Sequence, residues 1–103
     1  MIILKSNREI EYIRAAGRIT ADALMLMREL AVPGVTTQEL DRRCEEYIRS
    51  QGAFPSCKGY YGFPATICAS VNEEVVHGIP GHRKLHDGDI ISVDLVVNKD
   101  GYH

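Results

Sequence analysis

The 103-residue sequence lacks a strong charge of either sign. Twelve lysines and arginines nearly balance 14 aspartates and glutamates, which gives a formal net charge of −2. Such a chain has no electrostatic field that would gather nucleic acid or anionic lipid, so a basic nucleic-acid-binding module is disfavoured. With 25% charged and 45% hydrophobic residues, the composition is instead typical of one globular domain with a modest core.

Cysteine motifs and long apolar runs are also absent. The cysteines, Cys44, Cys57 and Cys68, are odd in number and form no C-x-x-C pair. We therefore expect no zinc clip, but free thiols in a reducing cytoplasm. No stretch approaches the roughly 20 apolar residues that a membrane span needs, and the N-terminus turns charged at Lys5. We expect a cytoplasmic protein without membrane contact.

The first half of the sequence predicts two amphipathic helices. Apolar residues recur every three or four positions from Ile10 to Leu30, which indicates one helical stripe. Ser6 and Glu9 have the spacing of a capping box at the start of this helix. Residues 33–34, a Pro-Gly pair, cannot continue it.

The second predicted helix begins at Thr36 or Thr37. Thr36 and Glu39 repeat the capping pattern there, and Gly52 ends the helix. Beyond it, residues 53–64 are dense in glycine, proline and aromatic residues, which predicts an irregular segment.

The second half of the sequence predicts an antiparallel sheet. Residues 65–71 and 75–77 have the composition of short strands, and residues 78–88 that of a loop. Residues 89–98 are apolar on both faces and rich in β-branched side chains, which predicts a buried strand at the centre of the sheet. A hairpin turn signal follows at 99–101, but its returning strand is cut off. We therefore expect the chain to be the front portion of a longer protein.

Asp94 is the most informative candidate for chemistry because it falls within the predicted buried strand. A buried carboxylate stays ionised only if a metal ion, an arginine or hydrogen-bond donors compensate for the loss of water. The strand alone therefore leaves two hypotheses open, a structural aspartate held by a hydrogen bond or salt bridge and a metal ligand.

Two other features point to a binding or catalytic site. His77 ends an apolar run where strand becomes loop, which suits a functional group but equally a histidine that only forms core or loop hydrogen bonds. Thiols and aromatic rings are concentrated within residues 57–68. They could line a pocket for a soft side chain such as that of methionine, or they could simply cap the end of the core. This set comprises Cys57, Tyr60, Tyr61, Phe63 and Cys68.

The order of these segments resembles the bacterial-type (type I) methionine aminopeptidases over the whole chain. Six segments carry the resemblance: 10–17, 32–37, 59–64, 68–73, 76–80 and 87–94. The resemblance implies an α+β fold that is the first half of a pita-bread (creatinase/aminopeptidase) fold. It would consist of two helices followed by an antiparallel sheet, truncated at a hairpin. Residues 1–103 would then be the N-terminal half of a metalloaminopeptidase catalytic domain.

The same resemblance implies removal of N-terminal methionine from nascent polypeptides by hydrolysis assisted by two divalent metal ions. These ions would be cobalt, manganese, iron or zinc. Asp94 matches the first metal-binding aspartate of the family, and His77 matches a histidine that contacts the scissile amide and is not a ligand. The pocket for the initiator methionine would be lined by Cys57, Tyr60, Phe63 and Cys68. Phe63 departs from a tyrosine found in some relatives.

The implied partners are a peptide or nascent-chain N-terminus and the ribosome, without direct nucleic-acid contact, and the complete enzyme would be a monomer. The family completes its metal site with a second aspartate, a histidine and two glutamates that these 103 residues do not supply. The chain alone is therefore predicted to be inactive. Two alternatives stay open: a non-catalytic binding protein with the pita-bread fold, and a small α+β interaction module.

Overall fold

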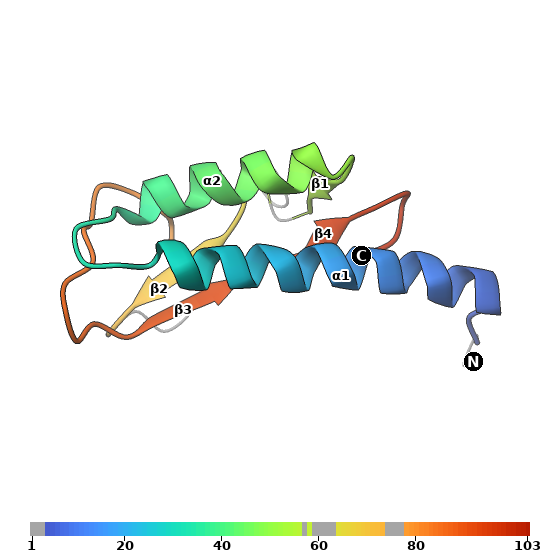
Figure 1. Ribbon diagram of the computed structural model, residues 1–103, viewed down its shortest axis with the longest axis horizontal. Coiled ribbons are helices and arrows are strands. Elements are labelled where there is room, and N and C mark those ends of the chain that lie inside the picture. The colour runs from blue at the N-terminus through green and yellow to red at the C-terminus, as the bar shows by residue number, and fades with distance from the viewer. Residues whose placement is uncertain (1–3, 57, 59–63, 74–77) are drawn as a thin grey trace.

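The computed structural model describes residues 4–56, 58, 64–73 and 78–103. Two helices, α1 and α2, lie side by side and pack against small antiparallel sheets (Figure 1). The strands β1 to β4 follow the helices in the chain. Within these described ranges, neither helix is both long and apolar enough to cross a membrane.

Helix α1 spans Asn7–Leu30 and has the predicted boundaries. The capping box is present: Ser6 Oγ accepts a hydrogen bond from Glu9 N at 3.1 Å, and Ser6 N donates to Glu9 Oε1 at 3.0 Å. These two bonds satisfy backbone and side-chain groups that the first helical turn would otherwise leave open. The side chains that α1 buries recur at steps of three or four: Ala16, Ile19, Ala23 and Met27.

Helix α2 spans Thr37–Ser50 and also begins where its capping residue predicts. Thr36 Oγ1 accepts a hydrogen bond from Glu39 N at 3.1 Å. Gly52 adopts a positive φ of +70° just beyond the helix, a conformation that glycine adopts at little cost. The residues buried completely on its inner face are Leu40, Cys44 and Ile48.

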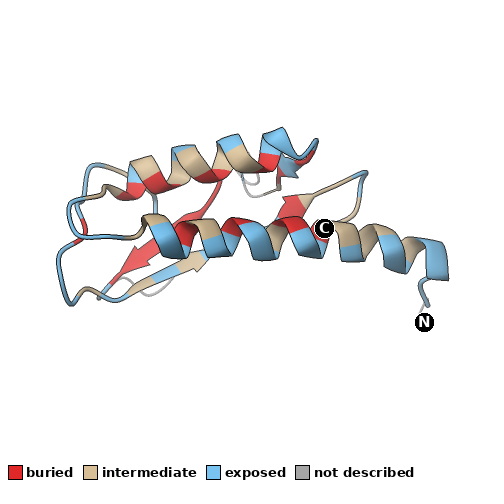
Figure 2. Cartoon of the chain, in the orientation of Figure 1, coloured by how far each residue is buried: buried red, intermediate tan, exposed pale blue. Residues whose placement is uncertain are grey.

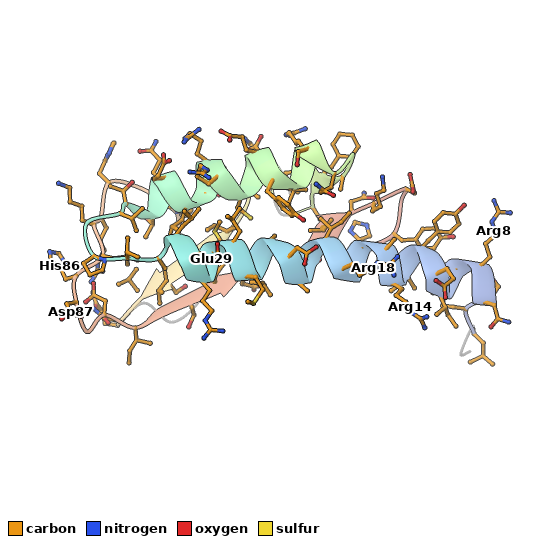
Figure 3. The ribbon with its side chains drawn as sticks, in the orientation of Figure 1. Arg8, Arg14, Arg18, Glu29, His86 and Asp87 are labelled. Carbon is orange, nitrogen blue, oxygen red and sulfur yellow. The ribbon has the colours of Figure 1, made fainter. Side chains whose placement is uncertain are left out.

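The two helices share one core with the sheets, and Figure 2 shows buried positions along their inner sides. The largest sheet and loop side chains in this core are Ile67, Val71, Leu85, Leu95 and Val97. Charged side chains occupy the outer surfaces of the molecule, where Arg8, Arg14, Arg18 and Glu29 of α1 extend into solvent (Figure 3). The helices are therefore amphipathic, as their sequence pattern predicts.

The strands form two antiparallel pairs. In one pair, β2 (Cys68–Val71) lies beside β3 (Ile91–Asp94), with Cys68 opposite Asp94. In the other, β1 (Phe54–Pro55) lies beside β4 (Val97–Asn98). Strand β1 falls in the segment predicted to be irregular. The sequence did not predict this strand because its partner lies more than 40 residues away in the chain.

The prediction of one buried central strand over residues 89–98 is wrong. The segment divides at residues 95–96 into β3 and β4, which belong to different sheets. The bend brings both Leu95 and Val97 into the core while Val96 stays exposed. All four residues of β2 are buried, whereas β3 alternates between half-buried and exposed residues. Among the described residues, β2 is therefore the buried strand of this two-stranded sheet.

The predicted strand over residues 65–71 is shorter than expected. Residues 65–67 are irregular, and the strand begins at Cys68. The reason is a competing acceptor: Asp41 Oδ1 on α2 accepts hydrogen bonds from Thr66 N at 2.8 Å and from Ile67 N at 2.9 Å. The strand predicted at residues 75–77 lies outside the described residues.

The hairpin turn predicted at residues 99–101 is present. Asp100 and Gly101 have φ values of +53° and +85°, the positive values of a two-residue hairpin turn. Lys99 and Tyr102 exchange two backbone hydrogen bonds, at 2.8 and 3.0 Å. The Tyr102 ring stacks on Tyr12 of α1 with centroids 5.2 Å apart, which ties the turn to the helix.

Candidate functional site

The sheet of β2 and β3 has two chemically different faces, because residues directly opposite in an antiparallel pair point to the same side. One face is apolar and joins the core with the helices: Ala69, Val71, Ile91 and Val93. The other, which we call the polar face, comprises Cys68, Ser70, Ser92 and Asp94. The predicted metal ligand therefore lies on the side of the sheet that the hydrophobic core does not use.

Asp94 is exposed, which corrects the expectation of a buried carboxylate. It is the last residue of β3, and within the described part of the chain β3 is hydrogen-bonded to β2 alone. An exposed carboxylate keeps its hydration and needs no compensating partner. The argument that burial must be compensated by a cation or a donor therefore does not apply, and the candidacy of Asp94 rests on its position in the sheet.

Cys68 is the register partner of Asp94 and is only 5% exposed. Side chains directly opposite in such a pair have Cβ atoms about 4.5–5.5 Å apart. The structure thus brings together one residue of the predicted methionine pocket and the predicted metal ligand. The other predicted site residues lie outside the described ranges: Cys57, Tyr60, Phe63 and His77.

Gly78, the residue after His77 in the sequence, is fixed against β2. Its N–H donates to Ser70 Oγ at 3.1 Å, and its carbonyl accepts from Ala69 N at 2.8 Å. A Cβ built on Gly78 would lie 2.4 Å from Ala69 O. Because no side chain fits at that distance, glycine allows the two backbones to meet. Gly78 is thereby anchored beside Ser70, a residue of the polar face.

The chain from Gly78 onward is a loop, as predicted, and it is anchored to the start of α2. Gly81 N donates to Thr37 Oγ1 at 2.8 Å, and Gly81 O accepts from Gln38 N at 2.9 Å. Further along, Leu85 N donates to Val35 O at 2.8 Å. These bonds connect the helix, the loop and β2 into one support for the polar face.

Two carboxylates of α2 accept hydrogen bonds from the residues immediately before β2. Asp41 receives the amides of Thr66 and Ile67, and burial raises the pKa of its carboxyl group despite these hydrogen bonds. Glu45 accepts from Lys58 Nζ at 2.6 Å and from Thr66 Oγ1 at 3.0 Å. The hydrogen bond from Lys58 is the main reason that the pKa of Glu45 falls to about 2. Sequence reasoning missed both residues, since their partners are more than ten positions away.

Cys44 does not belong to the candidate site. It is a free thiol on the inner face of α2 and is completely buried in the core. Burial, with the nearby charges of Asp41 and Glu45, raises the pKa of this thiol to about 12. Because the thiolate is the reactive form, Cys44 is chemically inert and serves packing.

The polar face can supply one metal ligand but not a complete metal site. Within the described residues, no three histidine, cysteine, aspartate or glutamate side chains are grouped so that they could hold a metal ion. Asp94 offers a suitable oxygen donor, but divalent ions in hydrolytic sites need several protein ligands. The described residues of the polar face could therefore provide a metal ion with only one anionic ligand.

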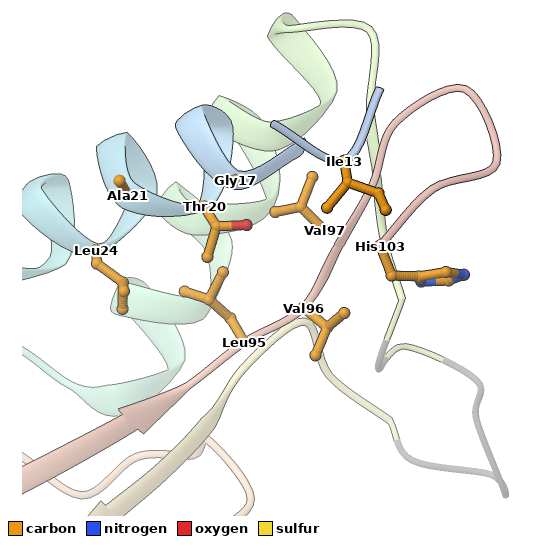
Figure 4. A pocket seen from close by; sticks show the side chains of 9 residues that line it. All are labelled: Ile13, Gly17, Thr20, Ala21, Leu24, Leu95, Val96, Val97 and His103. Atoms are coloured by element: carbon orange, nitrogen blue, oxygen red, sulfur yellow. The ribbon is translucent and has the colours of Figure 1, made fainter. Parts of the chain in front are cut away.

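An open groove lies between α1 and the residues that follow Asp94. It has a volume of about 400 Å³ and is lined by α1 and residues 95–97 (Figure 4). Small or apolar residues dominate it, including Ile13, Gly17 and Leu24. Gly17 and Leu24 lie within the predicted apolar stripe, but the structure leaves both exposed. Among its described lining residues, His103 is the only one with an ionisable side chain, so the groove offers no cluster of chemical groups.

The same fold occurs in a solved aminopeptidase. The methionine aminopeptidase of Thermotoga maritima matches with a TM-score of 0.92 and 40% identity, over 98% of this chain and 41% of that chain. This match confirms the predicted α+β fold class, the first half of a pita-bread fold.

The model of metallopeptidase family M24 matches residues 11–103, and the chain belongs to this family. It is 56% identical to the methionine aminopeptidase of Clostridium acetobutylicum over 103 residues, 99% of this chain and 41% of the relative. It is 53% identical to methionine aminopeptidase 1 of Bacillus subtilis, over 100% of this chain and 42% of the relative. The chain thus spans about two fifths of the length of these curated relatives. Membership of a metallopeptidase family implies a divalent metal cofactor.

Proposed function

We propose that this chain is the N-terminal half of the catalytic domain of a methionine aminopeptidase. In this proposal the protein removes the first methionine of nascent polypeptides, acting as a monomer in the cytoplasm and near the ribosome. The observation that supports it most is the pairing of Cys68 with Asp94 on the polar face, within a fold shared with methionine aminopeptidases. In this proposal, one wall of the methionine pocket lies beside a metal ligand.

Each predicted residue has one role in this proposal. Asp94 holds the metal, and Cys68 contributes to the methionine pocket together with Cys57, Tyr60 and Phe63. His77 contacts the scissile amide. Two divalent ions, drawn from cobalt, manganese, iron and zinc, would supply an activated water and polarise the substrate carbonyl. This chain alone provides too few ligands to hold them and is expected to be inactive.

The test joins residues 1–103 to the part of the Clostridium acetobutylicum relative that lies beyond the matched region. Hydrolysis of the tripeptide Met-Ala-Ser is measured with Mn²⁺, Co²⁺, Fe²⁺ or Zn²⁺, and bound metal is measured by mass spectrometry. We expect turnover from the fusion and none from residues 1–103 alone. Asp94→Asn should lower turnover at least about 100-fold, more than the loss of a residue that only orients a ligand, and should release metal.

Asp87→Asn, a change in the loop before β3, is the matched control and should leave turnover unchanged. Full activity of the Asp94→Asn fusion would refute the ligand assignment. A folded but inactive fusion, beside an active Clostridium relative, would refute the peptidase proposal and favour a non-catalytic binding protein with the same fold.

A further inference from the structure

The start of β2 is held from α2 by Asp41. Its Oδ1 atom accepts hydrogen bonds from two consecutive amides, Thr66 N at 2.8 Å and Ile67 N at 2.9 Å. Thr66 and Ile67 are completely buried, and Cys68 follows them directly. A single carboxylate oxygen thus fixes the backbone immediately before the residue that faces Asp94.

Glu45, one helical turn further along α2, holds the same segment through side chains. Its Oε1 atom accepts from Thr66 Oγ1 at 3.0 Å and from Lys58 Nζ at 2.6 Å, while Oε2 accepts from Arg49 Nε at 2.9 Å. Thr66 is therefore bound at its backbone by Asp41 and at its hydroxyl by Glu45. Residues four apart on a helix lie on the same face, which is why both carboxylates reach one segment.

The residues on either side of these contacts are those proposed to line the methionine pocket. Lys58 and Thr66 bracket the stretch that contains Tyr60 and Phe63, and Cys68 follows two residues after Thr66. An apolar residue at position 41 would pack against the core without leaving a half-buried carboxylate. The carboxylate is explained by the two amides that it aligns.

We propose that Asp41 and Glu45 are positioning residues that set the location of Cys68, and hence of the proposed methionine pocket relative to Asp94. This inference rests on the proposed function. The hydrogen bonds of Asp41 and Glu45 to this part of the chain reach Thr66 and Ile67, so each acts through the segment 66–68. Displacing one wall of a substrate pocket by about 1 Å is enough to lower the reactivity of the bound substrate markedly.

The first arm of the test measures position without any enzyme activity. The 103-residue chain is treated with iodoacetamide under native conditions, and the rate at which each cysteine is alkylated is read by peptide mass spectrometry. In Asp41→Ala we expect Cys68 to react at least about tenfold faster than in the unsubstituted chain, as local opening of this segment becomes easier. Cys44 lies buried on the inner face of the same helix and reports opening of the whole chain, so it serves as the internal control, and its rate should rise much less than that of Cys68.

The second arm measures catalysis in the fusion used above. For Asp41→Ala we expect KM for Met-Ala-Ser to rise about tenfold, with the metal content unchanged. Asp41→Asn keeps an oxygen that can accept both amides, so it should restore KM to within about threefold of the unsubstituted fusion. Glu46→Ala removes a carboxylate that pairs with Arg42 on the outer surface, and it should change neither KM nor the Cys68 rate.

Three results would overturn the inference. Equal acceleration of Cys44 and Cys68 would mean general unfolding, and an unchanged Cys68 rate would mean that Asp41 does not hold the segment. Unchanged KM with faster Cys68 would mean that Cys68 does not belong to the pocket. If Asp41→Ala does not fold, Thr66→Val removes only the bond to Glu45 and is held to the same criteria. An inactive unsubstituted fusion would refute the proposed function, whereas the alkylation arm would still decide whether α2 positions Cys68.

Discussion

Gly78 and Ala69 meet backbone to backbone, with Ala69 N donating to Gly78 O at 2.8 Å and no space for a side chain between them. This contact fixes the loop that follows His77 to the buried strand β2. It requires a residue without Cβ, because the nearest atom to an added Cβ would be a main-chain oxygen that cannot move aside.

Gly78→Ala is therefore expected to destabilise the chain. The added methyl group must push apart the Gly78 loop and β2, at a cost of about 1–3 kcal/mol in the free energy of unfolding. Gly81→Ala is the matched control, since a Cβ there meets nothing within 4 Å, and it should cost less than about 0.5 kcal/mol. Urea denaturation of the two variants tests this, and equal stability would show that the contact does not restrict position 78.

Asp94→Asn is expected to leave the stability of the chain almost unchanged, within about 0.5 kcal/mol, because the carboxylate is exposed. Asp41→Ala should behave differently. It leaves the amides of Thr66 and Ile67 buried without their acceptor, at a cost of about 1–3 kcal/mol for each unsatisfied group. Urea unfolding at pH 7 separates the two, and a large loss in Asp94→Asn would indicate a structural role for that residue.

Glu45 is expected to make stability depend on pH in acid. Its pKa falls to about 2 in the folded chain, mainly through Lys58. The folded chain thus binds fewer protons here than the unfolded chain, and the stabilisation is complete above the ordinary pKa of a glutamate, near pH 4.5. It is lost as the pH falls from there toward 2.

The measurement compares the unfolding free energies of the unsubstituted chain and Glu45→Gln between pH 7 and pH 2.5. The difference should be about 1 kcal/mol or less at pH 7, since Lys58 and Arg49 are nearly half exposed. It should shrink steadily below pH 4.5. A difference that stays constant over the whole range would contradict the assigned ion pairs.

Gly17→Ala is expected to stabilise the chain. Gly17 lies in the interior of α1, and a Cβ there meets nothing within 4 Å. Replacing it reduces the freedom of the unfolded chain and raises helix propensity by about 0.5–1 kcal/mol. Gly101→Ala is the contrasting variant, because its φ of +85° is strained for any other residue, and it should destabilise. Thermal unfolding should move the two midpoints in opposite directions.

The sequence predicted those features that depend on neighbours close in the chain. Ser6 with Glu9 and Thr36 with Glu39 define the helix starts, because each pair acts within one turn. The hairpin at Asp100 and Gly101 is local in the same sense. Such patterns are legible without knowledge of the rest of the fold.

Features that depend on distant partners were not predictable. Asp41 shortens the predicted strand at residues 65–71 through bonds to residues 25 and 26 positions away, and nothing near Asp41 in the sequence announces them. The membership of Asp94 in a strand was predicted correctly, but its burial was not. Exposure depends on which layers pack over a strand, and an apolar run alone does not specify that.

The separation of the β2–β3 sheet into an apolar and a polar face also bears on how freely this protein can change. Ser92 and Asp94 are exposed and lie on the face opposite the core, so evolution or an engineer can alter the side chains there while the architecture persists. Exchanges at Ala69 or Val71 would disturb folding before they reached the chemistry. Relatives that keep this scaffold are therefore free to diverge in what they bind.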